Sequence, residues 1–143
     1  MDEFIKVIKE LKNKNNTFAA ELSDGKIFKA SGCTVEILLS KLNENEEFFM
    51  DSMVGVKKLG KAGALLMVHA NVCGVYAVDI TEEAEEVLEY FAVEVEYENK
   101  VSKDKISQKD SNNVNNVKKK SYSEAVQDVE DPMEAFEVLS KLI

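Results

Sequence analysis

Several residue types that build common functional sites are scarce in this sequence of 143 residues. It has one histidine, one proline, no tryptophan and two cysteines, Cys33 and Cys73, which do not form a CxxC pair. Two cysteines are too few for a disulfide scaffold, and free cysteines are usually buried. His69 lies near Cys73 alone, and a zinc site needs at least three protein ligands. We therefore expect reduced, at least partly buried thiols, no metal site and no cofactor, with His69 serving packing or capping.

Long hydrophobic runs are also missing. No stretch approaches the roughly 20 apolar residues of a membrane span, and residues 1–12 lack the apolar run of a secretory signal. The 27 acidic and 18 basic residues give a net charge of −9, which repels polyanions. These absences predict a cytoplasmic protein that partners neither membrane nor nucleic acid. The length suits one domain, residues 1–143.

Local patterns predict the secondary structure. The expected elements are a helix at 4–12, hairpin strands at 17–22 and 26–30, helices at 34–42 and 56–70, a strand at 75–80, a helix at 81–91, a strand at 92–98 and a helix at 131–143. Asp24-Gly25 predicts a type I′ hairpin turn. Thr34, Thr81 and Asp131 are the expected helix N-caps. Residues 102–120 have few apolar residues and no period, which favours a mobile loop.

The order of these elements predicts an α/β fold. Residues 75–80 are apolar on both faces, as in a central strand, whereas 92–98 alternate valine or tyrosine with glutamate and belong near a sheet edge. We expect a three-layer sandwich in which one mixed sheet of four to five strands carries helices on both faces.

The predicted helix at 56–70 contains unusual residues for a helix. Gly60 and Gly63 each cost about 1 kcal/mol in a helix interior, and three lysines between positions 57 and 61 oppose the helix dipole. One interpretation is an anion site, with backbone N–H groups near Gly55 and with Lys57 and Lys61 on one helix face. The alternative is that the glycines allow close packing and the lysines pair with acidic neighbours.

Further polar residues follow the expected central strand. Asp79, Thr81 and Glu82 lie at its end, where ligands bind in open α/β sheets. Helix capping by Thr81 is the alternative interpretation. Residues 121–124, which end in Glu124, form a second polar cluster, and by themselves they are typical of a helix cap.

The run 32–98 resembles a prokaryotic domain-of-unknown-function family, number eighteen ninety-three, and the resemblance extends more weakly to the C-terminus. The family's Asp-Lys-Val-Val-Gly-Lys-Ala motif matches residues 56–62, where Lys57, Gly60 and Lys61 carry over and Val56 replaces the aspartate. Its Cys-Pro-x-Glu motif matches residues 121–124, where only the glutamate, Glu124, carries over.

This resemblance implies a cytidine-deaminase-like fold. Cytidine deaminases carry their zinc ligands in His/Cys-x-Glu and Pro-Cys-x-x-Cys motifs on two core helices. The corresponding places here fall near 56–61 and 80–84, and neither offers a zinc ligand set. Zinc-dependent deamination is therefore not expected, and we assign no catalytic residue. Deaminase-like folds often pair through their helices, so the resemblance also suggests a homodimer.

The leading functional hypothesis is a nucleotide or other phosphate-bearing small molecule, bound without zinc chemistry. The expected binding residues are Gly55, Lys57, Gly60, Lys61, Asp79, Thr81, Glu82 and Glu124. One alternative is a structural or interaction protein that has lost the family's site residues. Another is an enzyme that uses Glu124 as a base, which no nucleophile or metal ligand accompanies.

Overall fold

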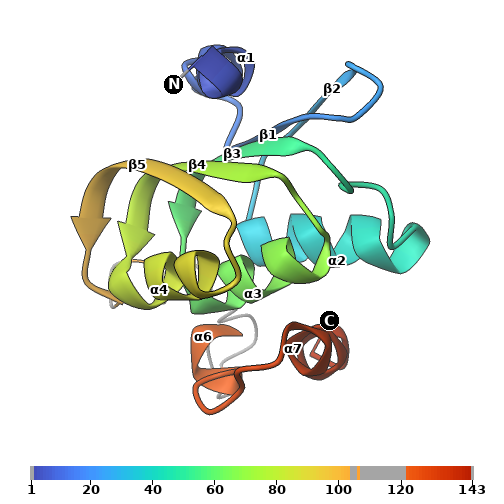
Figure 1. Ribbon diagram of the computed structural model, residues 1–143, viewed down its shortest axis with the longest axis vertical. Coiled ribbons are helices and arrows are strands. Elements are labelled where there is room, and N and C mark those ends of the chain that lie inside the picture. Colours follow the sequence, from blue (N-terminus) through green and yellow to red (C-terminus); the bar gives the residue numbers. More distant parts are fainter. Residues whose placement is uncertain (1, 104–105, 107–121, 143) are drawn as a thin grey trace.

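Five strands form one open, mixed sheet in the order β2-β1-β3-β4-β5 (Figure 1). They are β1 (Phe18–Glu21), β2 (Ile27–Ala30), β3 (Met53–Leu59), β4 (Gly74–Thr81) and β5 (Glu94–Val101). β1 runs antiparallel to β2 and β3, whereas β3, β4 and β5 are parallel. The computed structural model describes residues 2–103, 106 and 122–142, so most of the expected loop at 102–120 lies outside the described residues.

Helices cover both faces of this sheet, as expected for the α/β fold. They are the 3-10 helix η1 (Asp2–Phe4) and the α-helices α1 (Ile5–Leu11), α2 (Thr34–Glu44), α3 (Lys61–His69), α4 (Glu82–Tyr90), α6 (Tyr122–Ala125) and α7 (Pro132–Ser140). α1 lies on one face, and α2, α3 and α4 lie on the other (Figure 1). α6 and α7 form an additional outer layer, which the sequence did not predict. No helix in the described ranges is long and apolar enough to cross a membrane.

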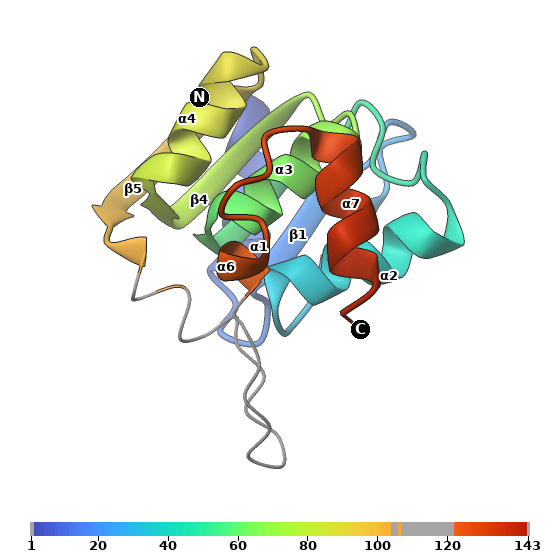
Figure 2. The same ribbon diagram turned by 90° about the horizontal axis from the view of Figure 1, so that it is seen from below.

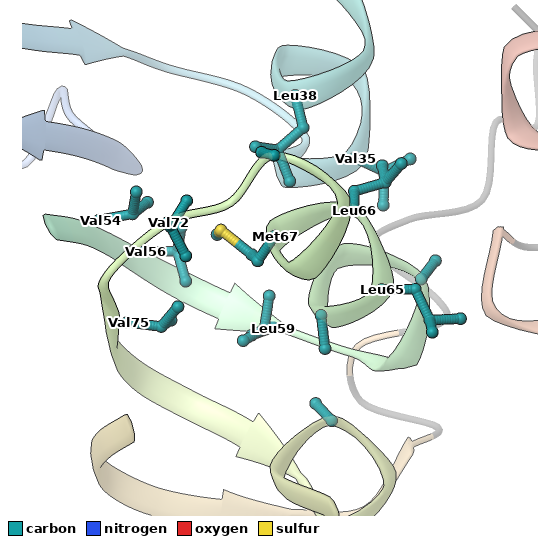
Figure 3. Packing of buried hydrophobic residues seen from close by; sticks show 14 of the residues in the cluster. Val35, Leu38, Val54, Val56, Leu59, Leu65, Leu66, Met67, Val72 and Val75 are labelled. Atoms are coloured by element: carbon teal, nitrogen blue, oxygen red, sulfur yellow. The ribbon is translucent and has the colours of Figure 1, made fainter. Parts of the chain in front are cut away.

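The main core lies between the sheet and α3. Figure 3 shows Val56 of β3 and Val75 of β4 on the side of the sheet that carries Leu66 and Met67 of α3. Residues 62–67 of α3 are all buried. A helix that is apolar around its whole circumference must be covered on all sides. The sheet covers one side of α3, and the outer layer covers the other.

The predicted helix at 56–70 is wrong in its first part, because residues 53–59 form β3. Gly60 alone separates β3 from α3. β3 is buried on both faces, so its apolar residues form a nearly continuous run without strand alternation. Lys57 therefore lies in a strand, and it does not share a helix face with Lys61. Gly60 is the N-cap of α3, so only Gly63 is inside the helix.

The glycines of this region serve close packing. A Cβ atom on Gly63 would lie 2.7 Å from Cδ1 of Leu59, and one on Gly55 would lie 3.0 Å from Cβ of Val7. Glycine fits at both positions because a side chain of a neighbouring element occupies the space that a Cβ atom would need. This supports the packing interpretation of these two glycines.

The hairpin at 17–30 is confirmed, but its turn type is wrong. A type I′ turn needs two positive φ angles, and only Gly25 has one, at 89°. The N–H of Leu22 donates to the carbonyl of Lys26 at 2.8 Å, and the N–H of Gly25 donates to the carbonyl of Leu22 at 2.8 Å. The loop therefore has three residues, with glycine in the left-handed region.

Two of the three predicted N-caps are confirmed. The hydroxyl of Thr81 accepts from the Ala84 N–H at 3.1 Å, and the carboxylate of Asp131 accepts from the Met133 N–H at 3.3 Å. Thr34 is instead the first residue of α2, and its hydroxyl donates to the carbonyl of Lys58 at 3.0 Å. That hydrogen bond ties α2 to β3.

Three further expectations can be compared with the structure. β5 lies at the sheet edge, as predicted. His69 is confirmed as a packing residue, since its ring stacks on Phe136 with centroids 4.5 Å apart and lies 3.1 Å from a carboxylate oxygen of Glu46. Cys33 is half-buried, but Cys73 is exposed, so the expected burial of both thiols is wrong for Cys73.

We predict that Gly55→Ala destabilises the fold by about 1–3 kcal/mol, because the added methyl group forces α1 away from β3. Urea unfolding measures this change. Lys57→Ala, two residues further along the same strand, adds no atom and is expected to cost less than about 1 kcal/mol. A Gly55→Ala protein as stable as the wild type would contradict the close approach of α1.

Candidate functional site

The carboxyl ends of β3 and β4 bring two helix N-termini to one edge of the sheet. α3 begins one residue after β3, and α4 begins directly after Thr81 of β4. Both helices lie on the same face of the sheet (Figure 1). In open α/β sheets this edge is where ligands bind, since it combines strand ends with helix N-termini.

A recess of about 130 Å³ opens at this edge. Its lining residues come from α3, β4, α4, the residues after β5, α6 and the segment after α6, and they are Lys61, Thr81, Glu83, Lys103, Ser123 and Gln127. Among its described lining residues, two lysines and one glutamate give the recess a net positive charge in a protein of net charge −9. No histidine or cysteine lines it among the described residues.

Lys61 connects this recess to the outer layer. Its side chain is 13% exposed, and its Nζ donates to the carbonyl of Gln127 at 2.9 Å. A carboxylate oxygen of Glu130 lies 3.4 Å from the same Nζ. A cation at a helix N-terminus opposes the dipole, and these two oxygen atoms offset that cost. The ammonium group therefore has protein partners as well as a place in the recess.

The structure brings together only part of the predicted site. Lys61 and Thr81 both line the recess, and Gly60 and Glu82 lie beside them in the chain. Glu82 is exposed in the first turn of α4. Asp79 accepts a hydrogen bond from the side-chain amide of Asn99 at 3.2 Å and does not line the recess.

The remaining predicted residues lie elsewhere. Gly55 faces α1, and Lys57 follows it by two residues in β3, so strand alternation places both on the α1 face of the sheet. The recess lies among the helices of the opposite face. Glu124 is an exposed residue of α6, next to Ser123 in the recess lining.

Sequence reasoning missed four lining residues. They are Glu83, Lys103, Ser123 and Gln127. Glu83 lies in the first turn of α4, and the other three residues reach the recess from the outer layer and from the end of β5. The only local signal was the polar cluster at 121–124, which contains Ser123.

A larger groove of about 760 Å³ adjoins the recess. Its lining residues are Lys61, Glu83, Glu86, Val87, Tyr90, Phe91, Glu130, Asp131 and Pro132. Lys61 and Glu83 line both hollows, but their charges differ. Counting the described lining residues, four carboxylates and one lysine make the groove net negative, whereas the recess is net positive.

A third polar region lies on the sheet face that carries α1. Carboxylate oxygens of Glu3, Glu94 and Glu96 lie within 4.8 Å of one another, a spacing that a metal ion could span. Glu3 and Glu94 are exposed. Beside them, the hydroxyl of Tyr76 donates to Glu98. Burial, followed by this hydrogen bond to the Glu98 carboxylate, raises the pKa of Tyr76 well above its usual range.

Residues 6–143 match the DUF1893 family, a domain of unknown function. The chain belongs to this family. A solved structure of a DUF1893 family protein (TM1506) from Thermotoga maritima superposes with a TM-score of 0.76 at 15% sequence identity. The match covers 99% of this chain and 90% of the other. At this identity the likeness shows a shared DUF1893 fold. A comparison with curated proteins finds no match.

The raised pKa of Tyr76 predicts a loss of stability at alkaline pH. In the folded protein, Tyr76 keeps its hydroxyl proton above pH 10, whereas in the unfolded chain Tyr76 releases it there. This contribution is therefore complete below about pH 10 and declines as the pH rises further. Urea unfolding between pH 8 and pH 11 should show a weaker decline for Tyr76→Phe than for wild type.

Tyr90→Phe is the matched control, because Tyr90 is 83% exposed. The stability of Tyr90→Phe is expected to fall between pH 8 and pH 11 by as much as that of the wild type. An equal decline in wild type and Tyr76→Phe would show that the Tyr76 proton does not contribute to stability.

Proposed function

We propose that this DUF1893 protein is a binding domain of cytidine-deaminase-like fold, and that its recess receives the phosphate group of a nucleotide or other phosphate-bearing small molecule. The observation that carries the proposal is the pair Lys61 and Lys103 in a recess between two helix N-termini. A net positive hollow in an acidic protein attracts an anion selectively.

The topology agrees with the proposed fold. The mixed sheet has two consecutive parallel crossovers, through α3 and α4, and both helices start at the edge where the recess opens. In cytidine deaminases, whose fold the family resemblance implies, the zinc ligands lie on two core helices. Here α3 begins with Lys61-Ala62-Gly63 and α4 begins with Glu82-Glu83-Ala84. Lys61 suits anion binding, and neither helix start carries the donor set of a deaminase zinc.

The size of the recess limits what enters it. Sites for whole small molecules usually enclose about 300–1,000 Å³, whereas the recess encloses about 130 Å³. It therefore suits a single group such as a phosphate, and the rest of the ligand extends outward. Lys103 is exposed and Ser123 is half-buried, so both are accessible to an incoming anion.

Lys61 needs no rearrangement of the backbone to bind an anion. Its partner Glu130 has an 84% exposed side chain, which can turn into solvent. The bond from Lys61 to the carbonyl of Gln127 is retained in that case. A phosphate oxygen in the recess would then become the second oxygen partner of the Lys61 ammonium group.

The same contacts support a second candidate, a cytoplasmic interaction protein without a ligand. Lys61 already has two oxygen partners, and residues 121–124 retain only the glutamate of the family's Cys-Pro-x-Glu motif. In this case Lys61 serves only to hold the outer layer on α3. The two candidates differ in whether an added anion binds.

Isothermal titration calorimetry at low salt, with inorganic phosphate, pyrophosphate, nucleoside monophosphates and unphosphorylated nucleosides, tests the proposal. We expect binding by the phosphate-bearing compounds and none by free nucleosides. Lys103→Ala should weaken binding by about tenfold or more, since a charged hydrogen bond contributes roughly 1.5–3 kcal/mol.

Lys57→Ala is the matched control, because it removes the same charge from the other face of the sheet. Its affinity should equal that of the wild type. An equal loss in both lysine variants would indicate a general charge effect and contradict a site at the recess. Absence of binding by every phosphate compound would favour the interaction protein.

A further inference from the structure

The groove continues the recess along α4. Lys61 and Glu83 line both hollows, so the two meet near the N-terminal end of this helix. The recess encloses about 130 Å³, whereas the groove encloses about 760 Å³. Sites for whole small molecules usually enclose about 300–1,000 Å³. A ligand whose phosphate group lies in the recess therefore has room in the groove for its remaining atoms.

One wall of the groove is a single face of α4. Its lining residues recur three or four positions apart along this helix and the residue after it, and they are Glu83, Glu86, Val87, Tyr90 and Phe91. Residues 130–132, which lead into α7, form the opposite wall. Figure 2 shows α7 lying over α3, with α4 to one side. The groove thus follows the length of α4, away from the recess.

The chemistry of the lining changes in a fixed order along this helix face. Lys61 supplies a positive charge at the end that the groove shares with the recess. The first two turns of α4 carry Glu83 and Glu86, whose carboxylates can only accept hydrogen bonds. Tyr90 and Phe91 lie at the far end of the helix. The order from the recess outward is therefore a cation, hydrogen-bond acceptors and aromatic rings.

The aromatic end of the groove suits a flat ring system. Tyr90 is 83% exposed and Phe91 is 36% exposed. Their ring centroids are 4.9 Å apart and their planes are inclined at 82°. Because the two rings are nearly perpendicular, a flat group that stacks on one ring meets the edge of the other. Val87, which is buried one turn earlier, adds apolar surface between this end and the carboxylates.

The length of the groove also limits what it can hold. Glu83 and Tyr90 are seven residues apart, which corresponds to about 10 Å along the helix axis. A nucleoside monophosphate extends over a comparable length. Its phosphate, its ribose with two hydroxyl donors and its aromatic base follow one another in the same order as the cation, the acceptors and the rings of the site.

We propose that the recess and the groove together form a site for a nucleoside monophosphate. The phosphate group lies in the recess, the ribose hydroxyls donate to the carboxylates of Glu83 and Glu86, and the base stacks on Tyr90. This inference rests on the proposed phosphate site, and it names the class of ligand that the site takes.

The same geometry disfavours nucleoside diphosphates. The recess has room for one phosphate group, so a second one must lie outside it. If the terminal phosphate occupies the recess, the inner phosphate lies beside Glu83 and Glu86, where like charges repel. If the inner phosphate occupies the recess, the terminal phosphate has no space there. Monophosphates are therefore the preferred ligands.

Isothermal titration calorimetry of the full chain at constant ionic strength tests this ligand class. The compounds are inorganic phosphate, ribose 5-phosphate, the four nucleoside monophosphates of RNA and the matching diphosphates. Ribose 5-phosphate should bind more tightly than inorganic phosphate. At least one monophosphate should bind at least about fivefold more tightly than ribose 5-phosphate, because stacking of one base on an aromatic side chain has an effect of this size. Each diphosphate should bind more weakly than its monophosphate.

Two pairs of variants assign the parts of the ligand. Tyr90→Ala should weaken binding of the preferred monophosphate at least about fivefold and leave the affinity for inorganic phosphate unchanged. Tyr97→Ala is its matched control, because it removes a partly exposed tyrosine ring outside both hollows. Glu86→Gln should narrow the preference for monophosphate over diphosphate, since it removes a negative charge from the groove. Glu89→Gln makes the same change on α4 outside both hollows and should leave that preference intact.

The outcomes separate this inference from the proposed phosphate site. Binding of inorganic phosphate that Lys103→Ala weakens, together with monophosphates that bind no better than ribose 5-phosphate, would leave the phosphate site standing and overturn the nucleotide. An equal loss in Tyr90→Ala and Tyr97→Ala would overturn stacking in the groove. Diphosphates that bind as tightly as monophosphates would contradict the role of the carboxylates. Failure of every phosphate compound to bind would overturn both proposals.

Discussion

β3 and β4 pair in parallel at the centre of the sheet, and the position of nearly every other element follows from that pairing. A parallel connection needs a crossover, and α3 provides it within residues 60–73. Because both strands end at the same edge, α3 and α4 begin there together. The convergence of Lys61 and Thr81 is therefore a consequence of backbone topology, and the recess opens where the two helices start.

The burial of α3 explains why Lys61 has two roles. An apolar helix on the sheet needs cover on its outer side, and the C-terminal segment with α6 and α7 provides that cover. Lys61 holds this C-terminal segment against α3 by donating a hydrogen bond to the carbonyl of Gln127. Its ammonium group also separates two hollows of opposite charge. Among the described lining residues, the recess is net positive and the groove is net negative.

The sequence predicted best those elements whose ends are marked by local chemistry. Thr81 and Asp131 cap their helices by hydrogen bonds within three residues, and Gly25 closes the hairpin by its own φ angle. The boundary between β3 and α3 has no such mark, because one glycine joins a strand buried on both faces to a helix that is apolar all round. Periodicity therefore merged them into one helix, and it misplaced Lys57.

The site was predictable only where it depends on strand ends. Thr81 lies at the end of a strand that the sequence predicted, whereas Lys61 was expected on the face of a helix at 56–70, whose first part is instead β3. Lys103 and Ser123 follow Lys61 by about 40 residues or more in the sequence, and only the packing of the outer layer brings Ser123 to the edge. Gly55, by contrast, has a packing role beneath α1 that its sequence neighbourhood did not reveal.

The central claim is that the edge formed by β3 and β4 is the ligand site of this DUF1893 protein. A titration with pyrophosphate, followed by two-dimensional ¹H–¹⁵N NMR, tests it residue by residue. The account predicts saturable shifts at the amides of Lys61, Ala62 and Ser123, while those of Gly55 and Lys57 remain unchanged. Shifts confined to Gly55 and Lys57, or no saturable shift at the edge, would contradict it.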